Sequence, residues 1–241
     1  MKSAARLSLF AALALTACHG EAVPAPSSTR ASSTNAASPL PEGLVTHEVG
    51  STGQVVILLH GYGAQGDDLV PLARQLGAAH FYFPEAPILM PTGGRRWFGR
   101  QSEGATAGEV DEARNGVIAL IEKLESEGTP ASEIILGGFS QGAMLTVDVA
   151  QHLAALGKQL GGLIVLSGST MPHWPANLDV RTNVLITHGQ TDRVLAITQA
   201  EQLQQRLIAS GSDVEFVPFP GGHAIPPIVQ SATADFIHRE D

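Results

Sequence analysis

One short stretch, residues 134–144, constrains the fold of this chain more than any other feature of its sequence. It reads IILGGFSQGAM, an aliphatic run followed by a glycine-rich turn and a segment of helical character. The turn has the pattern Gly-x-Ser-x-Gly, with Gly138 and Gly142 on either side of Ser140. A turn this tight between a strand and a helix strains the serine backbone and leaves little space for side chains at the two glycines. The stretch therefore predicts a nucleophile elbow that presents the Ser140 hydroxyl above the edge of a sheet.

The Gly-x-Ser-x-Gly pattern gains its weight from the elements around it. By itself it is weak, because a chain of 241 residues with 26 glycines is expected to contain about 0.2 such matches by chance. Unbroken aliphatic or aromatic runs, typical of strands buried on both faces, recur along the chain. They lie at residues 55–59, 81–83, 134–136, 163–166 and 184–187. Weaker patterns at 44–49 and 214–217 predict further strands, the second of them at an edge of the sheet.

Amphipathic segments alternate with these strands. Helices are predicted from Asp67 or Asp68 to Leu76, and over residues 109–124, 141–156, 194–210 and 226–238. This alternation predicts an α/β fold with a mostly parallel central sheet that is covered by helices on both faces. Residues 84–108 have no sustained period and are rich in Pro, Gly and Arg. A loop of this length inside a compact domain is usually functional.

Polar residues follow the strands directly, at the points where parallel strands bring their carboxyl ends to a common edge. Ligands of open α/β sheets bind at this edge. The residues concerned are His60, Ser140, Ser167, His188 and Asp192. The sequence therefore predicts one site there, with Ser140 as its nucleophile.

A serine hydroxyl needs a base within hydrogen-bond reach and a third group that orients the base. The best candidate for the base is His223, because the glycines before it allow an imidazole after the last strand to project into a cleft. We favour it over His60 and His188, whose His-Gly pairs at strand ends predict structural roles. Asp192 follows its strand closely, as the acid does in a Ser–Asp–His chain order. The alternative is that Asp192 only caps the next helix.

Asp179 and Asp213 are alternatives to Asp192, but both precede a strand and are expected at the opposite edge of the sheet. The oxyanion that forms when a carbonyl group is attacked needs preorganised hydrogen-bond donors. We expect these to be the backbone N–H of Gln141, directly after the nucleophile, and that of Tyr62, in the loop His-Gly-Tyr-Gly that follows residues 55–59. The alternative is that this loop is only a glycine-rich turn.

Several motifs together resemble the phospholipase/carboxylesterase family, in the acyl-protein-thioesterase-like branch of the α/β-hydrolases. From about residue 42 to the C-terminus they occur in the order LLHGYG at 58–63, FPEAP at 83–87, RWF at 96–98, GGFSQG at 137–142, LSG at 166–168, HGQTD at 188–192 and GH at 222–223. The resemblance implies a compact α/β-hydrolase without a large lid domain and without a metal ion or cofactor. It also implies a triad of Ser140, Asp192 and His223, with oxyanion donors at Tyr62 and Gln141.

These features predict a serine hydrolase that cleaves carboxylic esters, or thioesters, of small molecules through an acyl-enzyme. The alternatives are a surface-displayed binding or scaffold lipoprotein that no longer turns over, and a peptidase. The predicted substrate contacts are Trp97 and Tyr62, with plain core packing as the alternative for each ring. Candidates for another wall of the pocket are Met171 and Trp174. A basic cluster that either lies in solvent or contacts an anionic substrate group is formed by Arg95, Arg96 and Arg100.

The N-terminus predicts export. Residues 1–6 are basic and residues 7–16 are apolar and uncharged, as in a signal peptide. The LTAC that ends at Cys18 resembles the lipobox of bacterial lipoproteins, in which the cysteine is lipidated and becomes the new N-terminus; an ordinary secretory signal is the alternative. Cys18 is the one cysteine of the chain, so no intrachain disulfide competes for it. We expect a signal peptide at 1–17, a flexible Ala/Pro/Ser-rich tether at 18–40 and an α/β-hydrolase domain at 41–241.

The charge of the chain limits its partners. The formal net charge is -9, and binding to nucleic acid needs a basic field, so we expect no nucleic-acid partner. We expect membrane contact only through a lipid on Cys18, because a basic patch that would bind anionic lipids is missing. His19 is not the Asp that marks retention in the inner membrane. The predicted location is therefore a bacterial outer membrane, with the domain periplasmic or exposed on the surface.

Overall fold

The computed structural model describes residues 44–100 and 107–239. The predictions of a signal peptide at 1–17, of lipidation at Cys18 and of a tether at 18–40 lie outside the described residues. Among the helices in the described ranges, none combines the length and the apolar character that crossing a lipid bilayer requires.

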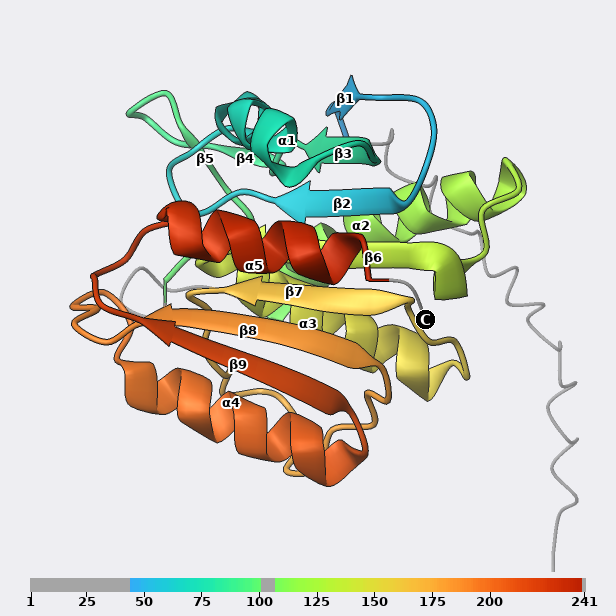
Figure 1. Ribbon diagram of the computed structural model, residues 1–241. Coiled ribbons are helices and arrows are strands. Elements are labelled where there is room, and N and C mark those ends of the chain that lie inside the picture. The colour runs from blue at the N-terminus through green and yellow to red at the C-terminus, as the bar shows by residue number, and fades with distance from the viewer. Residues whose placement is uncertain (1–43, 101–106, 240–241) are drawn as a thin grey trace, which may run out of the picture. The chain divides into compact units, whose positions relative to one another are not determined.

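A seven-stranded sheet with the strand order β1-β3-β2-β6-β7-β8-β9 forms the centre of the fold (Figure 1). β1 runs antiparallel to β3, and every other neighbouring pair is parallel. The strands are β1 (Thr46–Val49), β2 (Val55–Leu59), β3 (His80–Pro84), β6 (Ile134–Phe139), β7 (Gly162–Leu166), β8 (Asn183–Gly189) and β9 (Asp213–Phe219). The predicted α/β-hydrolase fold with a mostly parallel sheet is confirmed, and β9 is an edge strand as its alternating pattern predicts.

Helices cover both faces of this sheet. They are α1 (Val70–Leu76), α2 (Ala107–Ser126), α3 (Gln141–Ala155), α4 (Ile197–Ser210) and α5 (Pro227–Ile237). Successive residues of a strand point to opposite faces, so Ile57 of β2 packs in one core with α2, α3 and α4, whereas Val56 and Leu58 pack in a second core with α1 and α5. Figure 1 shows α1 and α5 on the near side of the sheet and α2 and α3 behind it. Burial on both faces explains why the inner strands are unbroken aliphatic runs.

Helix boundaries differ from the prediction mainly at the start of α1. The segment that begins at Gly66 is a 3-10 helix through Leu69, and α1 starts only at Val70. Asp68 explains the delay, because its side chain accepts a hydrogen bond from the backbone N–H of Gln65 at 2.8 Å and closes a tight first turn. Pro71 then occupies the first turn of α1, where a missing N–H costs nothing.

The segment expected to be an irregular loop contains a small hairpin. Its strands are β4 (Ile88–Leu89) and β5 (Arg95–Arg96), which pair antiparallel. The connecting turn closes with hydrogen bonds from Met90 N–H to the Gly94 carbonyl, at 2.8 Å, and from Gly93 N–H to the Met90 carbonyl, at 2.9 Å. Gly93 has a φ of 93°, which suits glycine. Such short strands leave no hydrophobic period that a sequence pattern could reveal.

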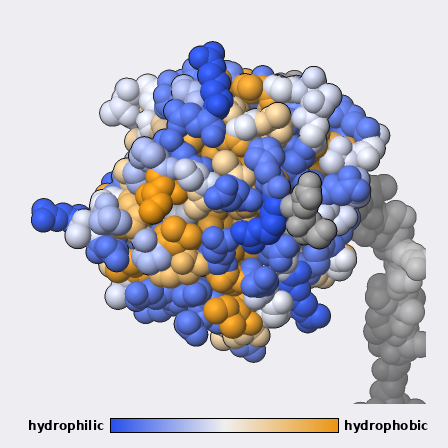
Figure 2. All heavy atoms as spheres, in the orientation of Figure 1, coloured by the Kyte–Doolittle hydropathy of each residue, from blue (hydrophilic) through white to orange (hydrophobic). Residues whose placement is uncertain are grey.

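The surface in Figure 2 is mostly polar, with apolar patches mainly on the left half of the view, toward the carboxyl ends of the strands. Among the described residues, the exposed large hydrophobic side chains are Val45, Leu89, Leu156, Val194, Ile208 and Ile228. Single exposed apolar residues of this kind are normal on protein surfaces.

Candidate active site

Ser140 lies at the turn between β6 and α3 in a strained backbone conformation. Its φ is 55° and its ψ is -114°, a region that residues with a side chain rarely adopt. Both flanking positions must be glycine, because a side chain at either one would collide with neighbouring backbone atoms. A Cβ on Gly138 would lie 2.5 Å from the backbone of Gly142, and a Cβ on Gly142 would lie 2.3 Å from the carbonyl oxygen of Leu59. The predicted elbow is therefore present, and Ser140 is partly buried and lines a cavity beside the sheet edge.

His223 bridges Ser140 and Asp192. Its Nε2 lies 2.8 Å from the Oγ of Ser140, and its Nδ1 lies 2.6 Å from the Oδ2 of Asp192. A carboxylate can only accept, so Nδ1–H donates to Asp192 and Nε2 is free to accept the serine proton. The imidazole also packs against the ring of Phe139, with the ring centroids 4.8 Å apart. Three residues remote in the sequence thus form one hydrogen-bonded chain.

The carboxylate of Asp192 is fully buried, with a side-chain exposure of 0%. Burial by itself would raise the pKa of this carboxyl, but the backbone N–H of Leu195, the imidazole of His223 and the backbone N–H of Val194 all donate to it and bring the pKa below its ordinary value. The bonds from Val194 and Leu195 reach Oδ1, at 2.8 and 3.0 Å. Asp192 therefore holds both the chain that leads into α4 and the imidazole, and the two roles considered for it coexist.

Gln141 has a role that the sequence did not reveal. It is the first residue of α3, and its buried side chain binds the segment that follows β5. Its Oε1 accepts from the backbone N–H of Trp97 at 2.9 Å, and its Nε2 donates to the carbonyl of Phe98 at 2.6 Å. No local pattern signals a glutamine with this role, because its partners lie more than forty residues away.

The structure corrects the prediction that Trp97 contacts substrate. The indole is fully buried, with 0% exposure, and its Nε1–H donates to the carbonyl of His60 at 2.8 Å. Its ring also packs on the imidazole of His60, with a centroid distance of 5.2 Å. Phe98, the next residue, lines the cavity instead. Trp97 therefore packs against the start of the loop after β2 and holds it through the His60 carbonyl.

A cavity of about 740 Å³ opens beside Ser140. Its apolar lining includes Tyr62, Phe98, Val110, Met144, Met171 and Leu195. Tyr62 and Met171 are thus placed as predicted, whereas Trp174 stays outside the lining and its Nε1–H donates to Asp148. Arg100 also lines the cavity, with its guanidinium 4.1 Å from the centroid of the Tyr62 ring. The other members of the basic cluster form ion pairs elsewhere, Arg95 with Glu85 and Arg96 with Glu109.

His60 and His188 are buried in structural positions. Nδ1–H of His60 donates to the Gly61 carbonyl at 2.8 Å, and Nε2 accepts from the backbone N–H of Ala86 at 3.1 Å. Burial lowers the pKa of His60, which fits the neutral tautomer that this pattern requires. His188 donates from Nε2 to the carbonyl of Leu195 at 2.8 Å. Both rings therefore hold the loops beside the triad.

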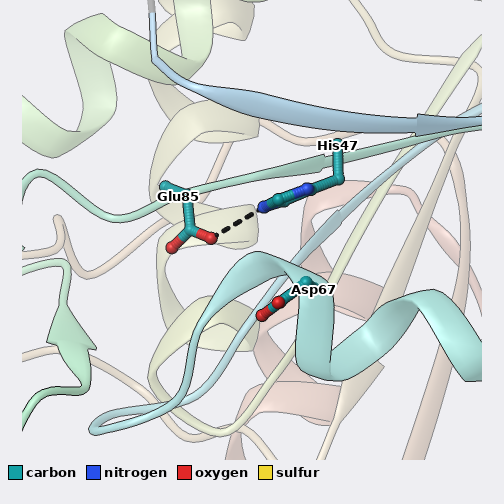
Figure 3. A group of neighbouring side chains, drawn as sticks. All are labelled: His47, Asp67 and Glu85. Carbon is teal, nitrogen blue, oxygen red and sulfur yellow. Dashed lines mark hydrogen bonds and ion pairs between the residues drawn. The ribbon is translucent and has the colours of Figure 1, made fainter.

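One group in the described part of the chain has the composition of a metal site. Ligand atoms of His47, Asp67 and Glu85 come within 4.8 Å of one another (Figure 3). The Glu85 carboxylate already accepts from Nε2 of His47 at 2.9 Å and lies 3.6 Å from the guanidinium of Arg95. These contacts explain the buried carboxylate without an ion, and we assign no metal to it.

Comparison with known proteins agrees with this architecture. Residues 44–239 match the model of the family described as Phospholipase/Carboxylesterase. An acyl-protein thioesterase 1 homolog of Dictyostelium discoideum is 30% identical over 219 residues, covering 83% of this chain and 96% of the relative. Carboxylesterase SOBER1 of Arabidopsis thaliana is 30% identical over 193 residues, covering 70% and 83%.

A solved structure extends the agreement to three dimensions. The crystal structure of esterase PE8 superposes with a TM-score of 0.70 at 26% identity, covering 80% of this chain and 97% of that one. The family match spans the whole described sheet and both of its helical layers. The chain therefore belongs to the phospholipase/carboxylesterase family of α/β-hydrolases and is a hydrolase of the carboxylesterase and thioesterase class.

Proposed function

We propose that this protein hydrolyses carboxylic esters, and thioesters, of small molecules through an acyl-enzyme on Ser140. The observation that carries the proposal is the hydrogen-bonded chain from the Ser140 hydroxyl through His223 to Asp192, with links of 2.8 and 2.6 Å. A buried, ionised Asp192 favours the tautomer of His223 whose Nε2 accepts the serine proton. The strained elbow and the family relationship support the same reading.

In the proposed reaction, Oγ of Ser140 attacks the carbonyl carbon while its proton moves to Nε2 of His223. Collapse of the tetrahedral intermediate breaks the bond to the leaving alcohol or thiol, which takes that proton from the imidazolium. Water then attacks the acyl carbon while His223 takes its proton; the bond to Oγ breaks, the carboxylic acid leaves, and Oγ of Ser140 regains the proton from the imidazolium. We assign the stabilisation of the oxyanion to the backbone N–H groups of Gln141 and Tyr62.

The apolar lining of the cavity suits an apolar acyl or alcohol group, and we propose that this is the part of the substrate that it binds. Its volume of about 740 Å³ lies within the range of small-molecule sites, roughly 300–1,000 Å³. The names of two relatives, an acyl-protein thioesterase and a carboxylesterase, support both bond types. We propose esters of medium-length acyl chains as the substrates to test first.

Replacement of the nucleophile tests the proposal. We expect Ser140→Ala to lower kcat for p-nitrophenyl butyrate by roughly 10⁴- to 10⁶-fold, because the alanine cannot form the acyl-enzyme. Ser126→Ala removes an exposed serine at the end of α2 and should leave the rate unchanged. Hydrolysis by Ser140→Ala at the rate of the parent would show that another group performs the reaction.

The alternative, a binding protein that does not turn over, predicts a different result with a fluorophosphonate probe. Such a probe forms a covalent bond only with an activated serine. We expect the parent protein to be labelled at Ser140 and Ser140→Ala to remain unlabelled. A parent protein that stays unlabelled at high probe concentration would favour the binding protein.

We further propose that the chain is exported and anchored through lipid on Cys18, with its domain in the periplasm or on the cell surface. The basic residues 1–6, the apolar residues 7–16 and the LTAC sequence support this location. Attachment by more than one acyl chain is stable, whereas a single chain gives only reversible binding.

A further inference from the structure

The loop that carries Tyr62 is restricted little by its own backbone. It contains Gly61 and Gly63, and Gly63 has a φ of 81°. Glycine backbones have a wide choice of conformations, yet an oxyanion donor must stay within a few tenths of an ångström of its place to be effective. Another part of the molecule must therefore hold this loop.

The backbone of β5 holds the loop directly after Tyr62. Gly63 N–H donates to the Arg95 carbonyl at 2.7 Å, and Arg95 N–H donates to the Ala64 carbonyl at 2.9 Å. The contact is so close that a Cβ on Gly94 would lie 2.0 Å from the carbonyl oxygen of Gly63. The position of the Tyr62 N–H thus depends on the position of the Arg95 backbone.

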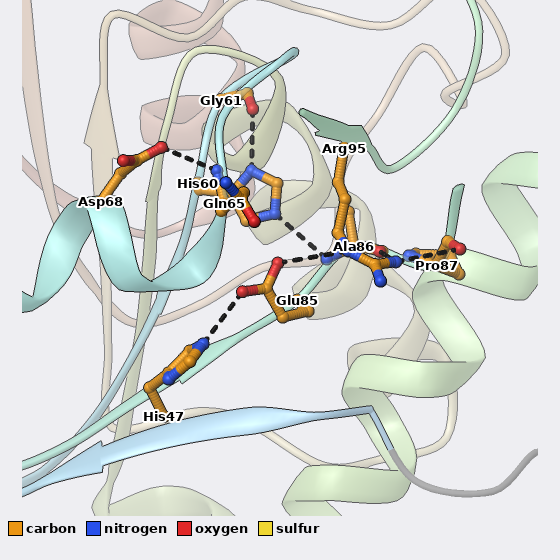
Figure 4. A network of polar contacts seen from close by, with 9 residues as sticks. All are labelled: His47, His60, Gly61, Gln65, Asp68, Glu85, Ala86, Pro87 and Arg95. Atoms are coloured by element: carbon orange, nitrogen blue, oxygen red, sulfur yellow. Dashed lines mark hydrogen bonds and ion pairs between the residues drawn. The ribbon is translucent and has the colours of Figure 1, made fainter. Parts of the chain in front are cut away.

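The side chain of Arg95 is fixed in turn to the segment that directly follows β3 (Figure 4). Its Nη1 donates to the carbonyl of Ala86 at 2.9 Å and faces the carbonyl of Pro87 at 3.4 Å. Its Nε lies 3.6 Å from Oε2 of Glu85. The Ala86 N–H donates to His60, the residue with which the loop begins. The contacts therefore form a closed ring from the loop through β5 and the segment after β3 back to the loop.

Glu85 supplies the charge that keeps the guanidinium in this ring. The residue is only 8% exposed, and Nε2 of His47 donates to its Oε1 at 2.9 Å. Among the described residues, Oε2 has no hydrogen-bond partner, which leaves the Arg95 guanidinium at 3.6 Å to balance its charge. A buried carboxylate without a counter-charge is costly, so the pair restricts where Arg95 can lie.

We propose that Arg95, held by Glu85, is a positioning residue for the oxyanion hole: it fixes the β5 backbone that places the Tyr62 N–H. The inference rests on the proposed esterase function. Arg95 acts through the loop and does not touch the substrate, since it is not among the residues that line the cavity. Its contribution therefore belongs to the transition state, where the oxyanion forms, and not to the binding of the ground-state ester.

Arg95→Lys and Glu85→Gln test the proposal while keeping the size and polarity of each side chain. A lysine keeps the charge but has one ammonium group, which cannot bind the Ala86 carbonyl and Glu85 with the geometry of a guanidinium. We expect kcat for a butyryl ester to fall about 10- to 100-fold in Arg95→Lys, as for other displacements of catalytic groups, and less in Glu85→Gln. We expect KM to change by less than about threefold, because the cavity is unaltered.

A trifluoromethyl ketone separates this role from a general structural one, because its adduct with Ser140 carries the oxyanion. Across the variants we expect its Ki to rise by the same factor by which kcat/KM falls. Arg96→Lys is the matched control: Arg96 lies beside Arg95 on β5 but pairs with Glu109 on α2, at 3.4 Å, and its kcat and Ki should stay at the parent values. All rates are referred to active sites counted by burst titration, so that unfolded protein does not contribute.

Parent-like kcat and Ki in Arg95→Lys and Glu85→Gln would overturn the proposal. So would a rise of KM at constant kcat, which would assign the pair to the shape of the cavity. Ser140→Ala in the same assay keeps this failure distinct from a failure of the proposed function. If Ser140→Ala is inactive and the Arg95 variant is unaffected, only the positioning role is wrong.

Discussion

The two carboxylate oxygens of Asp192 bind different partners, and this division determines how the residue responds to pH. Oδ1 accepts from the backbone of Val194 and Leu195, while Oδ2 accepts from His223. These bonds outweigh burial and hold the pKa below its ordinary value of 3.8. The ionised group therefore stabilises the folded chain fully above that pH, and the stabilisation is lost as the pH falls through the lower pKa of the folded state.

Asp192→Asn tests both consequences. At pH 7 we expect kcat to fall by roughly 10³- to 10⁴-fold, because the amide no longer requires the tautomer of His223 that accepts the serine proton. We expect the free energy of unfolding of the variant to lie below that of the parent at neutral pH, and the difference to shrink below about pH 4. Urea denaturation at pH 7 and at pH 3 measures it.

Asp179→Asn is the control, because Asp179 is exposed and pairs with Arg181 at 2.8 Å. Exposed pairs contribute little to stability, so this variant should keep the activity of the parent and nearly its stability. A stability difference between the parent and Asp192→Asn that persists unchanged at pH 3 would contradict the assignment of the lowered pKa to the folded state.

At the scale of elements, one buried carboxylate joins α2, α3 and the segment after β7. Asp148 lies one turn beyond the cavity residue Met144 on α3 and is only 4% exposed. Its Oδ1 accepts from His173 and from Trp174, each at 2.7 Å, and its Oδ2 accepts from Arg114 of α2 at 2.9 Å. The segment that ends at Trp174 includes the cavity residues 170–173, so these bonds hold one wall of the cavity.

Trp174→Phe removes one of these bonds and keeps a ring of similar shape. We expect KM for an octanoyl ester to rise about fivefold, which corresponds to roughly 1 kcal/mol of lost wall contact. The kcat for an acetyl ester should stay within about twofold, because the triad is not touched. His152→Gln is the control, because His152 lies on α3, as Asp148 does, but outside the cavity lining. An unchanged preference among acetyl, butyryl and octanoyl esters would show that the hydrogen bond from Trp174 to Asp148 does not position residues 170–173 of the cavity.

At the scale of the whole molecule, the catalytic chemistry and the predicted membrane attachment fall on different parts of the chain. The family match and all the contacts described above lie within residues 44–239. Residues 18–40 have a composition that buries little apolar surface, so we expect them to add little to the stability of the domain.

Truncation and a single substitution test this division. A chain that starts at residue 41 should keep the kcat and the unfolding temperature of the longer chain. Cys18→Ala should move the protein from the membrane fraction to the soluble fraction of a bacterial host without changing kcat. Retention of Cys18→Ala in the membrane fraction would argue against lipidation, and a large loss of stability on truncation would argue against the tether.

The sequence by itself determined the main strands and helices of the fold and the polar residues that gather at the sheet edge. A strand buried on both faces must be apolar throughout, so 55–59 and 163–166 predict strands from local composition alone. The steric demands of the elbow restrict Gly138 and Gly142, and the placement of polar residues after strands indicates Ser140, Asp192 and His223. Each of these signals is local, because it arises from the constraints on a few neighbouring residues.

Only the tertiary structure decided which side chains line the cavity and which ones hold the loops. Trp97 and Phe98 are adjacent aromatic residues, yet one is buried beneath His60 and the other lines the cavity. The side chain of Gln141 and the ring through Arg95 depend on segments that meet only in the folded chain. Whether a side chain is buried or hydrogen-bonded depends on neighbours from other elements, and no residue pattern within one element specifies those neighbours.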